Sequence, residues 1–471
     1  MDQVVRRGST KAPPWSGVDE SLGSTAAGTP VEADVIASTA TLQVRWPRRL
    51  SLFLIPSLAA LGPWASFTPG AEGSPYFFRI LLVLMLLPAL SGLRQEWHTL
   101  PPRMRSAAWA SLIFLLWGCF GLLWTPDTAL GQRNLISVTL GMISVGVMLG
   151  TMRGNPRAMA SLRWGFLAAV VVTGAIGLWE IRTGAHLSEH TDGAYSFSST
   201  SIAASFINPN NFGAFLLGTV GPTLIVIARL RSIVAQGLVS LLLVFTLFLA
   251  INTESRGAVA GALTLILIAS LALAAFDLGY FLVTVLLVTP VALAIPVFFS
   301  RRLSALITSV TSQADAGSDS LRVALTEHAV RYFFESGGVG TGPGSFQAVL
   351  AADPQRGTGR IVPAHNTFAQ IAAEYGVIGL VAFLVIIVAC VAAVLPVAKV
   401  GPQRLLQFEV VLCFAALVYA GLIASSVLGD PSWWVLIGYM LCLSWTHWTT
   451  PSGPPARDDA ADRVELNRDG G

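Results

Sequence analysis

Runs of about 18 or more apolar residues recur along most of this chain, and a helix of that length crosses the ~30 Å hydrocarbon layer of a bilayer. The chain has 471 residues, of which 54% are hydrophobic and 12% charged. A soluble domain carries about twice that charged fraction. The sequence therefore predicts an all-α polytopic membrane protein. It excludes soluble nucleotide-binding, nucleic-acid-binding and disulfide-rich secreted classes, so no nucleic-acid partner is expected.

The apolar runs predict about twelve transmembrane helices. The expected spans are 50–67, 76–93, 107–124, 135–152, 164–181, 212–229, 233–252, 257–274, 279–299, 376–395, 409–428 and 433–448. The domain organisation is then a transmembrane domain at 45–450 between two disordered cytoplasmic tails, 1–44 and 451–471. Both tails are polar and lack a periodic apolar face.

Arginine and lysine predict the orientation, because cytoplasmic loops carry the excess of positive charge. The turns "TPGAEGSP" and "GDPS" have none, and Arg133 is the exception on that side. Both termini are therefore expected in the cytoplasm. The long connection at about 300–365, between spans 9 and 10, is expected outside. Its segment "DSLRVALTEHAVRYFF" has the spacing of an amphipathic helix.

The four cysteines lie inside apolar runs without metal-ligand spacing: Cys119, Cys390, Cys413 and Cys442. This pattern is typical of small buried hydrophobic residues. We expect neither a disulfide framework nor a zinc site.

The segment "PAHNTFAQIAAEYG" places His365 just ahead of an apolar run. Pro363 suits the first turn of a helix, and a helix start disfavours imidazolium and so keeps a histidine neutral and able to accept a proton. On a continuous helix Glu374 falls on nearly the opposite face, so no direct pair with His365 is expected. Asn366 and Glu374 are possible substrate-binding or structural residues. The alternative is an interfacial histidine without a chemical role.

Arginines on the outer side are the second candidate group. Arg256, in "NTESRGAVAGA", lies at the outer end of two spans, and Arg322 opens the amphipathic helix. A guanidinium matches phosphate oxygens two at a time. Arg79 is a weaker candidate of the same kind. The alternative is contact with lipid headgroups.

Two further motifs precede and follow these arginines. In "FINPNNFGAF", Asn208 and Pro209 predict a helix N-cap and first turn, which leaves Asn210 facing protein or a wet cavity. The stretch "GTGPGSF" at 340–346 lacks the lysine and the strand of a nucleotide loop. A tight turn is expected there.

Five segments, in order, resemble motifs of the bacterial O-antigen ligase and O-antigen polymerase family: "NPNNFGAFL", "ESRGAVAGALTLIL", "LRVALTEHAVRYF", "GTGPGSF" and "HNTFAQIAAEYGVIGL". The resemblance extends from about residue 205 to 385. The chain departs from the family in having "ESGGV", without the usual proline, before the glycine-rich turn.

The resemblance implies a GT-C-like fold that transfers a glycan from a polyprenyl-diphosphate carrier, without metal or other cofactor. The acceptor would be a glycolipid, glycan or protein, at the outer face of the bacterial cytoplasmic membrane. Position by position, His365 resembles the catalytic histidine, and Arg256 and Arg322 resemble the ligands of the donor diphosphate.

Three alternatives remain. A transporter would place ionisable residues near the bilayer midplane on repeated halves, whereas the candidates here lie at one face. A non-catalytic lipid-glycan binding protein would need the arginines but not His365. A repeat-unit polymerase would need a second site for a diphosphate. The remaining loop arginines, Arg331, Arg356 and Arg360, are interleaved with acidic residues, which favours a ligase.

The orientation can be tested by cysteine labelling in intact cells. A cysteine introduced at Gly317 or Thr358 should react with a membrane-impermeant maleimide, because both positions lie in the expected external connection. A cysteine at Val400 should react only after the cells are permeabilised. Labelling of Val400 from outside would invert the orientation and move His365 to the cytoplasmic side.

Overall fold

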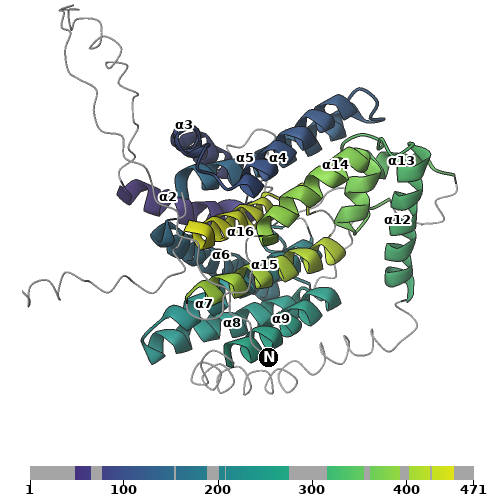
Figure 1. The fold of residues 1–471 in the computed structure, drawn as a ribbon. Helices are drawn as coiled ribbons and strands as arrows, with labels where there is room; N and C mark the ends of the chain where they lie inside the picture. Colours follow the sequence, from purple (N-terminus) through teal and green to yellow (C-terminus); the bar gives the residue numbers. More distant parts are fainter. Residues whose placement is uncertain are drawn as a thin grey trace, which may run out of the picture. The chain divides into compact units, whose positions relative to one another are not determined.

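The computed structural model describes residues 48–64, 77–152, 155–187, 201–206, 208–274, 316–354, 361–392, 402–424 and 427–449. Throughout these residues the chain is helical and contains no β-strand (Figure 1). The predicted all-α class is confirmed. The tails expected at 1–44 and 451–471 lie outside the described residues.

The elements follow one another along the chain with short connections. In order they are α2 (Arg48–Leu61), η1 (Gly62–Trp64), α3 (Phe77–Glu96), α4 (Pro102–Gly121), α5 (Thr128–Met152), α6 (Pro156–Thr183), α7 (Pro209–Arg229), α8 (Ile233–Asn252), α9 (Arg256–Ala274), α12 (Ala316–Glu335), α13 (Phe346–Ala352), α14 (Thr367–Ala392), α15 (Pro402–Ile423) and α16 (Pro431–Thr449).

Eight of the described helices are long and apolar enough to cross a membrane: α3 to α8, α14 and the Arg404–Leu422 part of α15. Phe53–Trp64 and Arg256–Ala269 are shorter apolar helices, and α16 occupies the last expected span. The expected span at 279–299 lies outside the described residues. A polytopic protein is confirmed, and the number twelve stays a prediction.

The helix α7 lies at the centre of the bundle. Its apolar window is 94% buried, and it packs on α6, α8, α9 and α15 (Figure 1). A helix that is apolar on every side is stable only when neighbours surround it. The helices that carry the candidate residues are thereby arranged around α7.

Small residues bring other helix pairs into close contact. A Cβ atom on Gly165 of α6 would lie 2.2 Å from the carbonyl oxygen of Pro56 in α2, and one on Gly150 of α5 equally close to that of Ala89 in α3. Close backbone approach through small residues is the usual way in which membrane helices associate. The first half of the chain is thus packed tightly behind the site.

The starts of α7, α9 and α14 and the end of α15 lie at one face of the bundle. Gly213, in the first turn of α7, packs against Ala258 in the first turn of α9. Gly421, near the end of α15, packs against Thr367 at the start of α14. Because α15 packs on both α9 and α14, these ends meet on the same side.

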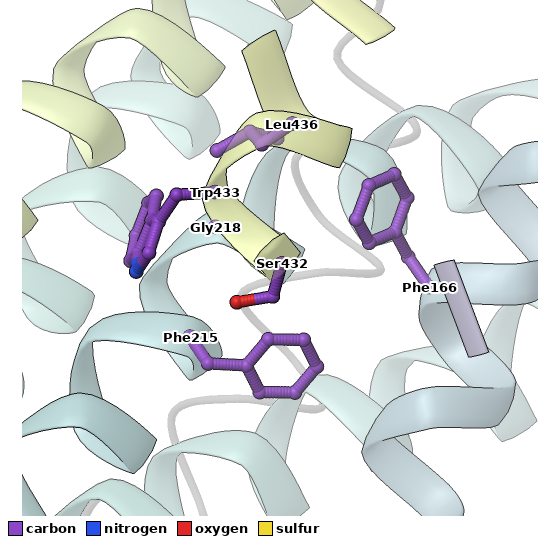
Figure 2. A pocket seen from close by; sticks show the side chains of 6 residues that line it. All are labelled: Phe166, Phe215, Gly218, Ser432, Trp433 and Leu436. Atoms are coloured by element: carbon purple, nitrogen blue, oxygen red, sulfur yellow. The ribbon is translucent and has the colours of Figure 1, made fainter. Parts of the chain in front are cut away.

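A small void lies between α6, α7 and α16 (Figure 2). Its volume is about 10 Å³, and Phe166, Phe215 and Leu436 line it together with Ser432, whose hydroxyl points into the space. That volume is at the lower limit for one water molecule. The void is too small for a sugar or a lipid, so it is a packing feature and not a binding site.

An ion pair is buried between α6, α15 and α16. Arg163 donates from Nε to Oε1 of Glu409 at 2.7 Å and from Nη2 to Oε2 at 2.6 Å, and the Tyr439 hydroxyl donates to the same carboxylate. Arg163 and Glu409 are 2% and 0% exposed. Buried charges of this kind persist only when they are paired and hydrogen-bonded.

We expect Glu409→Gln to destabilise the protein strongly, because it leaves the Arg163 charge buried without a counter-ion. Breaking such a pair costs ~3–5 kcal/mol. The double variant Arg163→Met with Glu409→Met should recover much of that loss. Thermal unfolding in detergent measures both, with Arg157→Met, an exposed arginine of the same helix, as control. An unchanged midpoint for Glu409→Gln would contradict a structural role.

Candidate active site

His365 lies in the non-helical segment 361–366, directly before α14. The helix starts at Thr367, so the prediction of a helix from Pro363 was wrong. Asn366 explains the difference, because its Oδ1 accepts hydrogen bonds from the backbone N–H groups of Phe368 and Ala369, both at 3.1 Å. Asn366 is therefore the N-cap.

The backbone of His365 is strained. Its φ angle is +52°, in the left-handed region that costs a non-glycine residue about 1–3 kcal/mol. Its Nδ1 atom is buried and has no hydrogen-bond partner among the described residues. The fold thus holds this imidazole in one place without using it in a structural contact.

The structure brings Arg322 close to His365. Arg322 belongs to α12, which packs on α14 at one end of the bundle (Figure 1). Burial, and secondly the positive charge of Arg322, lower the pKa of His365 to about 4. The imidazole is therefore neutral at physiological pH, as the sequence predicted, but the cause is burial beside a cation.

The helix α12 is fixed by a small core and a polar network. Leu325, Ala329 and Tyr332 are buried against α13 and the start of α14, which confirms the predicted helix. The Tyr332 hydroxyl donates to Asp353 at 2.8 Å, and Arg331 pairs with the same carboxylate. Burial, and then the bond to Asp353, raise the pKa of Tyr332 to about 12. Sequence reasoning had assigned Arg331 to a solvated surface, and this ion pair corrects that interpretation.

Gly376 breaks α14 into two helical parts. Its φ and ψ angles are 64° and −162°, which only glycine adopts without large strain. The glycine-rich turn docks here: a Cβ atom on Gly376 would lie 2.3 Å from the carbonyl oxygens of Gly338 and Val339. The tight turn predicted for 340–346 is confirmed, with positive φ angles at Gly340, Gly342 and Gly344.

The turn also satisfies the backbone groups that the break releases. The carbonyls of Ala373 and Glu374 accept from the N–H groups of Thr341 at 2.8 Å and Gly342 at 2.9 Å, while Val377 N–H donates to Gly338 at 2.8 Å. Trp117 of α4 donates from Nε1 to the carbonyl of Tyr375 at 2.7 Å. Buried backbone groups need such partners, so turn and break form one unit.

Glu374 is part of this unit. Its carboxylate accepts from the backbone N–H groups of Gly344 at 3.2 Å and Phe346 at 3.3 Å, and from Nε2 of Gln370 at 3.1 Å. It is 2% exposed. These contacts give Glu374 a structural role, and they hold its side chain on the turn.

The remaining predicted residues lie elsewhere on the bundle. Arg256 begins α9 and Asn210 follows the first residue of α7, and these two helix starts pack together. Asn208 is the N-cap of α7 and accepts from Asn211 N–H at 2.9 Å, as predicted. Arg79 is exposed on α3, which packs on α2 and α5, helices that carry none of His365, Arg322 and Arg256.

The cysteine prediction is confirmed for three of the four residues. Cys390, Cys413 and Cys442 are buried thiols, whereas Cys119 is exposed on α4.

A polar cavity of about 240 Å³ opens beside the broken helix. It lies between α5, α13 and the first part of α14, and its polar lining comprises Arg133, Asn134, Ser137, Gln347, Gln370 and Glu374. Sequence reasoning did not assign these α5 residues to the site. The one available signal was Arg133, the single positive charge that departs from the predicted charge asymmetry.

The architecture is that of a multi-span helical membrane protein with a histidine, an arginine and a polar cavity near one face. Residues 241–384 match the model of the O-antigen ligase family. The chain thus carries an O-antigen ligase domain, and the resemblance found in the sequence is confirmed. The matched segment includes Arg256, Arg322, His365 and Glu374, but not Asn210, Arg79 or the α5 side of the cavity. A search of curated proteins gives no match.

We expect Gly376→Ala to unfold or inactivate the protein, because the added Cβ would overlap two backbone carbonyls of the turn and strain the left-handed φ. The midpoint of thermal unfolding in detergent should fall steeply. Gly146→Ala is the matched control: it lies within α5 with nothing near its Cβ position, and alanine favours a helix by about 1 kcal/mol. Equal tolerance of both substitutions would contradict the clamped break.

Proposed function

We propose that the protein moves a glycan from a polyprenyl-diphosphate carrier to an acceptor hydroxyl, at the outer face of a bacterial cytoplasmic membrane. The observation that carries the proposal is the pairing of a neutral, strained His365 with Arg322 inside the O-antigen ligase domain. Strain that the surroundings maintain at one residue is typical of functional sites.

The proposed step is a displacement at C1 of the first sugar. The acceptor oxygen forms the new bond to C1, while the bond from C1 to the diphosphate oxygen breaks and the diphosphate leaves with the electron pair. His365 takes the proton of the attacking hydroxyl, as a general base does. Arg322 and Arg256 stabilise the negative charge that develops on the diphosphate, which fixed cationic donors do well in a site shielded from water.

The nearness of Arg322 to His365 has a further consequence for this step. A cation beside the imidazole disfavours its protonated form. A bound diphosphate would offset that positive charge, so the basicity of His365 would rise when the donor is in place. The donor thereby prepares the proton acceptor.

A ligase and a repeat-unit polymerase of the same family differ in the second substrate. The ligase is favoured here, since Arg331 is committed to its ion pair with Asp353 and is not available for a second diphosphate. The structure of Arg356 and Arg360 lies outside the described residues. A single-repeat lipid-linked donor, incubated without another acceptor, separates the two: a ladder of lipid-linked oligomers would indicate a polymerase.

The purified protein should transfer labelled glycan from the lipid carrier, and His365→Ala should lower the rate by about 10²–10⁴-fold while donor binding persists. Replacing Arg256 or Arg322 with Ala should lower it by about 10²–10³-fold. Near-wild-type transfer by His365→Ala would overturn the proposed base.

The pH dependence gives an independent readout. With a pKa of about 4 in the free enzyme, kcat/KM should stay level as the pH falls from 8 to about 5 and decline only near 4. In Arg322→Gln the cation is gone, so the pKa of His365 rises and the acid limb should move to higher pH. Arg322→Lys keeps the charge and should leave the limb in place, even where transfer is slower.

A further inference from the structure

The cavity beside α14 contains polar groups that the fold does not use. Gln370 is 6% exposed, and its Nε2 is bound to Glu374. Its Oε1 is buried without a hydrogen-bond partner in the described part of the chain. A buried acceptor left unpaired costs about 1–3 kcal/mol, so a ligand that donates to it is favoured.

The opposite wall of the cavity is formed by α5. Arg133 and Ser137, one turn apart, both line the space. Arg133 forms no salt bridge with any residue that the structure describes. The Ser137 hydroxyl donates to the Arg133 carbonyl at 3.1 Å, which leaves the guanidinium itself free to meet an anion.

The cavity is on a different side of His365 from the arginines proposed to hold the diphosphate. Pro363, two residues before His365, lines it, but neither Arg256 nor Arg322 does. Its walls come from α5, α13 and α14, whereas these arginines come from α9 and α12. A ligand in the cavity therefore approaches His365 from the side away from the donor.

We propose that this cavity binds one sugar ring of the acceptor and that this sugar carries a carboxylate or phosphate group. Arg133 pairs with the anionic group, and Gln370 Oε1 accepts a hydrogen bond from a ring hydroxyl. The volume of about 240 Å³ is below the ~300–1,000 Å³ of sites for drug-sized ligands, which suits a single ring. The inference rests on the proposed function, because it assigns the bound sugar to the acceptor.

Binding can be measured directly, without turnover. Glucuronate, glucose 6-phosphate and glucose are titrated against the full-length protein in nanodiscs, and binding is followed by saturation-transfer NMR and calorimetry. We expect the two anionic sugars to bind at least 10-fold more tightly than glucose. In Arg133→Gln that preference should disappear. The matched control is Gln132→Ala, an exposed neighbour on α5 that does not line the cavity.

Two variants fill the cavity from opposite walls, so a folding defect in one does not decide the outcome. Ser137→Phe on α5 and Gln347→Trp on α13 should each abolish sugar binding. The affinity for undecaprenyl diphosphate should stay unchanged in both. Thermal unfolding identifies which variant is folded well enough to interpret.

The outcomes separate this inference from the proposed function. Anionic sugar that binds equally to wild type and to the filled variants, competes with undecaprenyl diphosphate, or fails to bind wild type would overturn the cavity assignment. Sugar binding without any transfer from a lipid-linked glycan would leave the cavity in place and reject the transfer reaction. Transfer by wild type and by the filled variants with the same acceptor KM would do the reverse.

Discussion

The break in α14 at Gly376 is the feature on which the arrangement of the candidate site depends. A helix in a bilayer satisfies its own backbone hydrogen bonds, and a break exposes groups that neither lipid nor apolar side chains can satisfy. Here the glycine-rich turn and Trp117 supply the missing partners. The chain can therefore change direction before the apolar part of α14, which leaves the segment 361–366 and His365 at the end of the bundle.

The same unit connects parts of the site that are distant in sequence. Glu374 holds Gly344 and Phe346, and Phe346 begins α13, which packs with α12. Since α12 carries Arg322, the position of the cation beside His365 is linked to the break through a continuous set of contacts. Glu374 thus acts on the proposed chemistry through position, which its burial and three hydrogen-bond donors explain better than a direct role.

Much of this could be predicted from sequence, because it follows from local rules. The all-α class follows from the apolar runs, the N-cap at Asn208 from its Pro209 neighbour, and the tight turn from its glycines. The start of α14 was misplaced because Pro363 and Asn366 are both acceptable at a helix start, and only the capping bonds of Asn366 decide between them. The ion pair of Arg163 with Glu409 joins residues 246 positions apart, a contact that no local pattern encodes.

The O-antigen ligase domain at 241–384 contains the three residues proposed to act on the donor, but it does not contain the whole site. Trp117 and Trp124 of the α4–α5 region hold the break and the turn from outside that domain, through the carbonyls of Tyr375 and Gly340. Residues of α5 also form one wall of the cavity. Changes in α5 could therefore alter which molecule enters the cavity while the histidine, the arginines and the turn stay in place. Such a division lets one reaction serve different acceptors, because the helices that fix the chemistry are not those that shape the second wall.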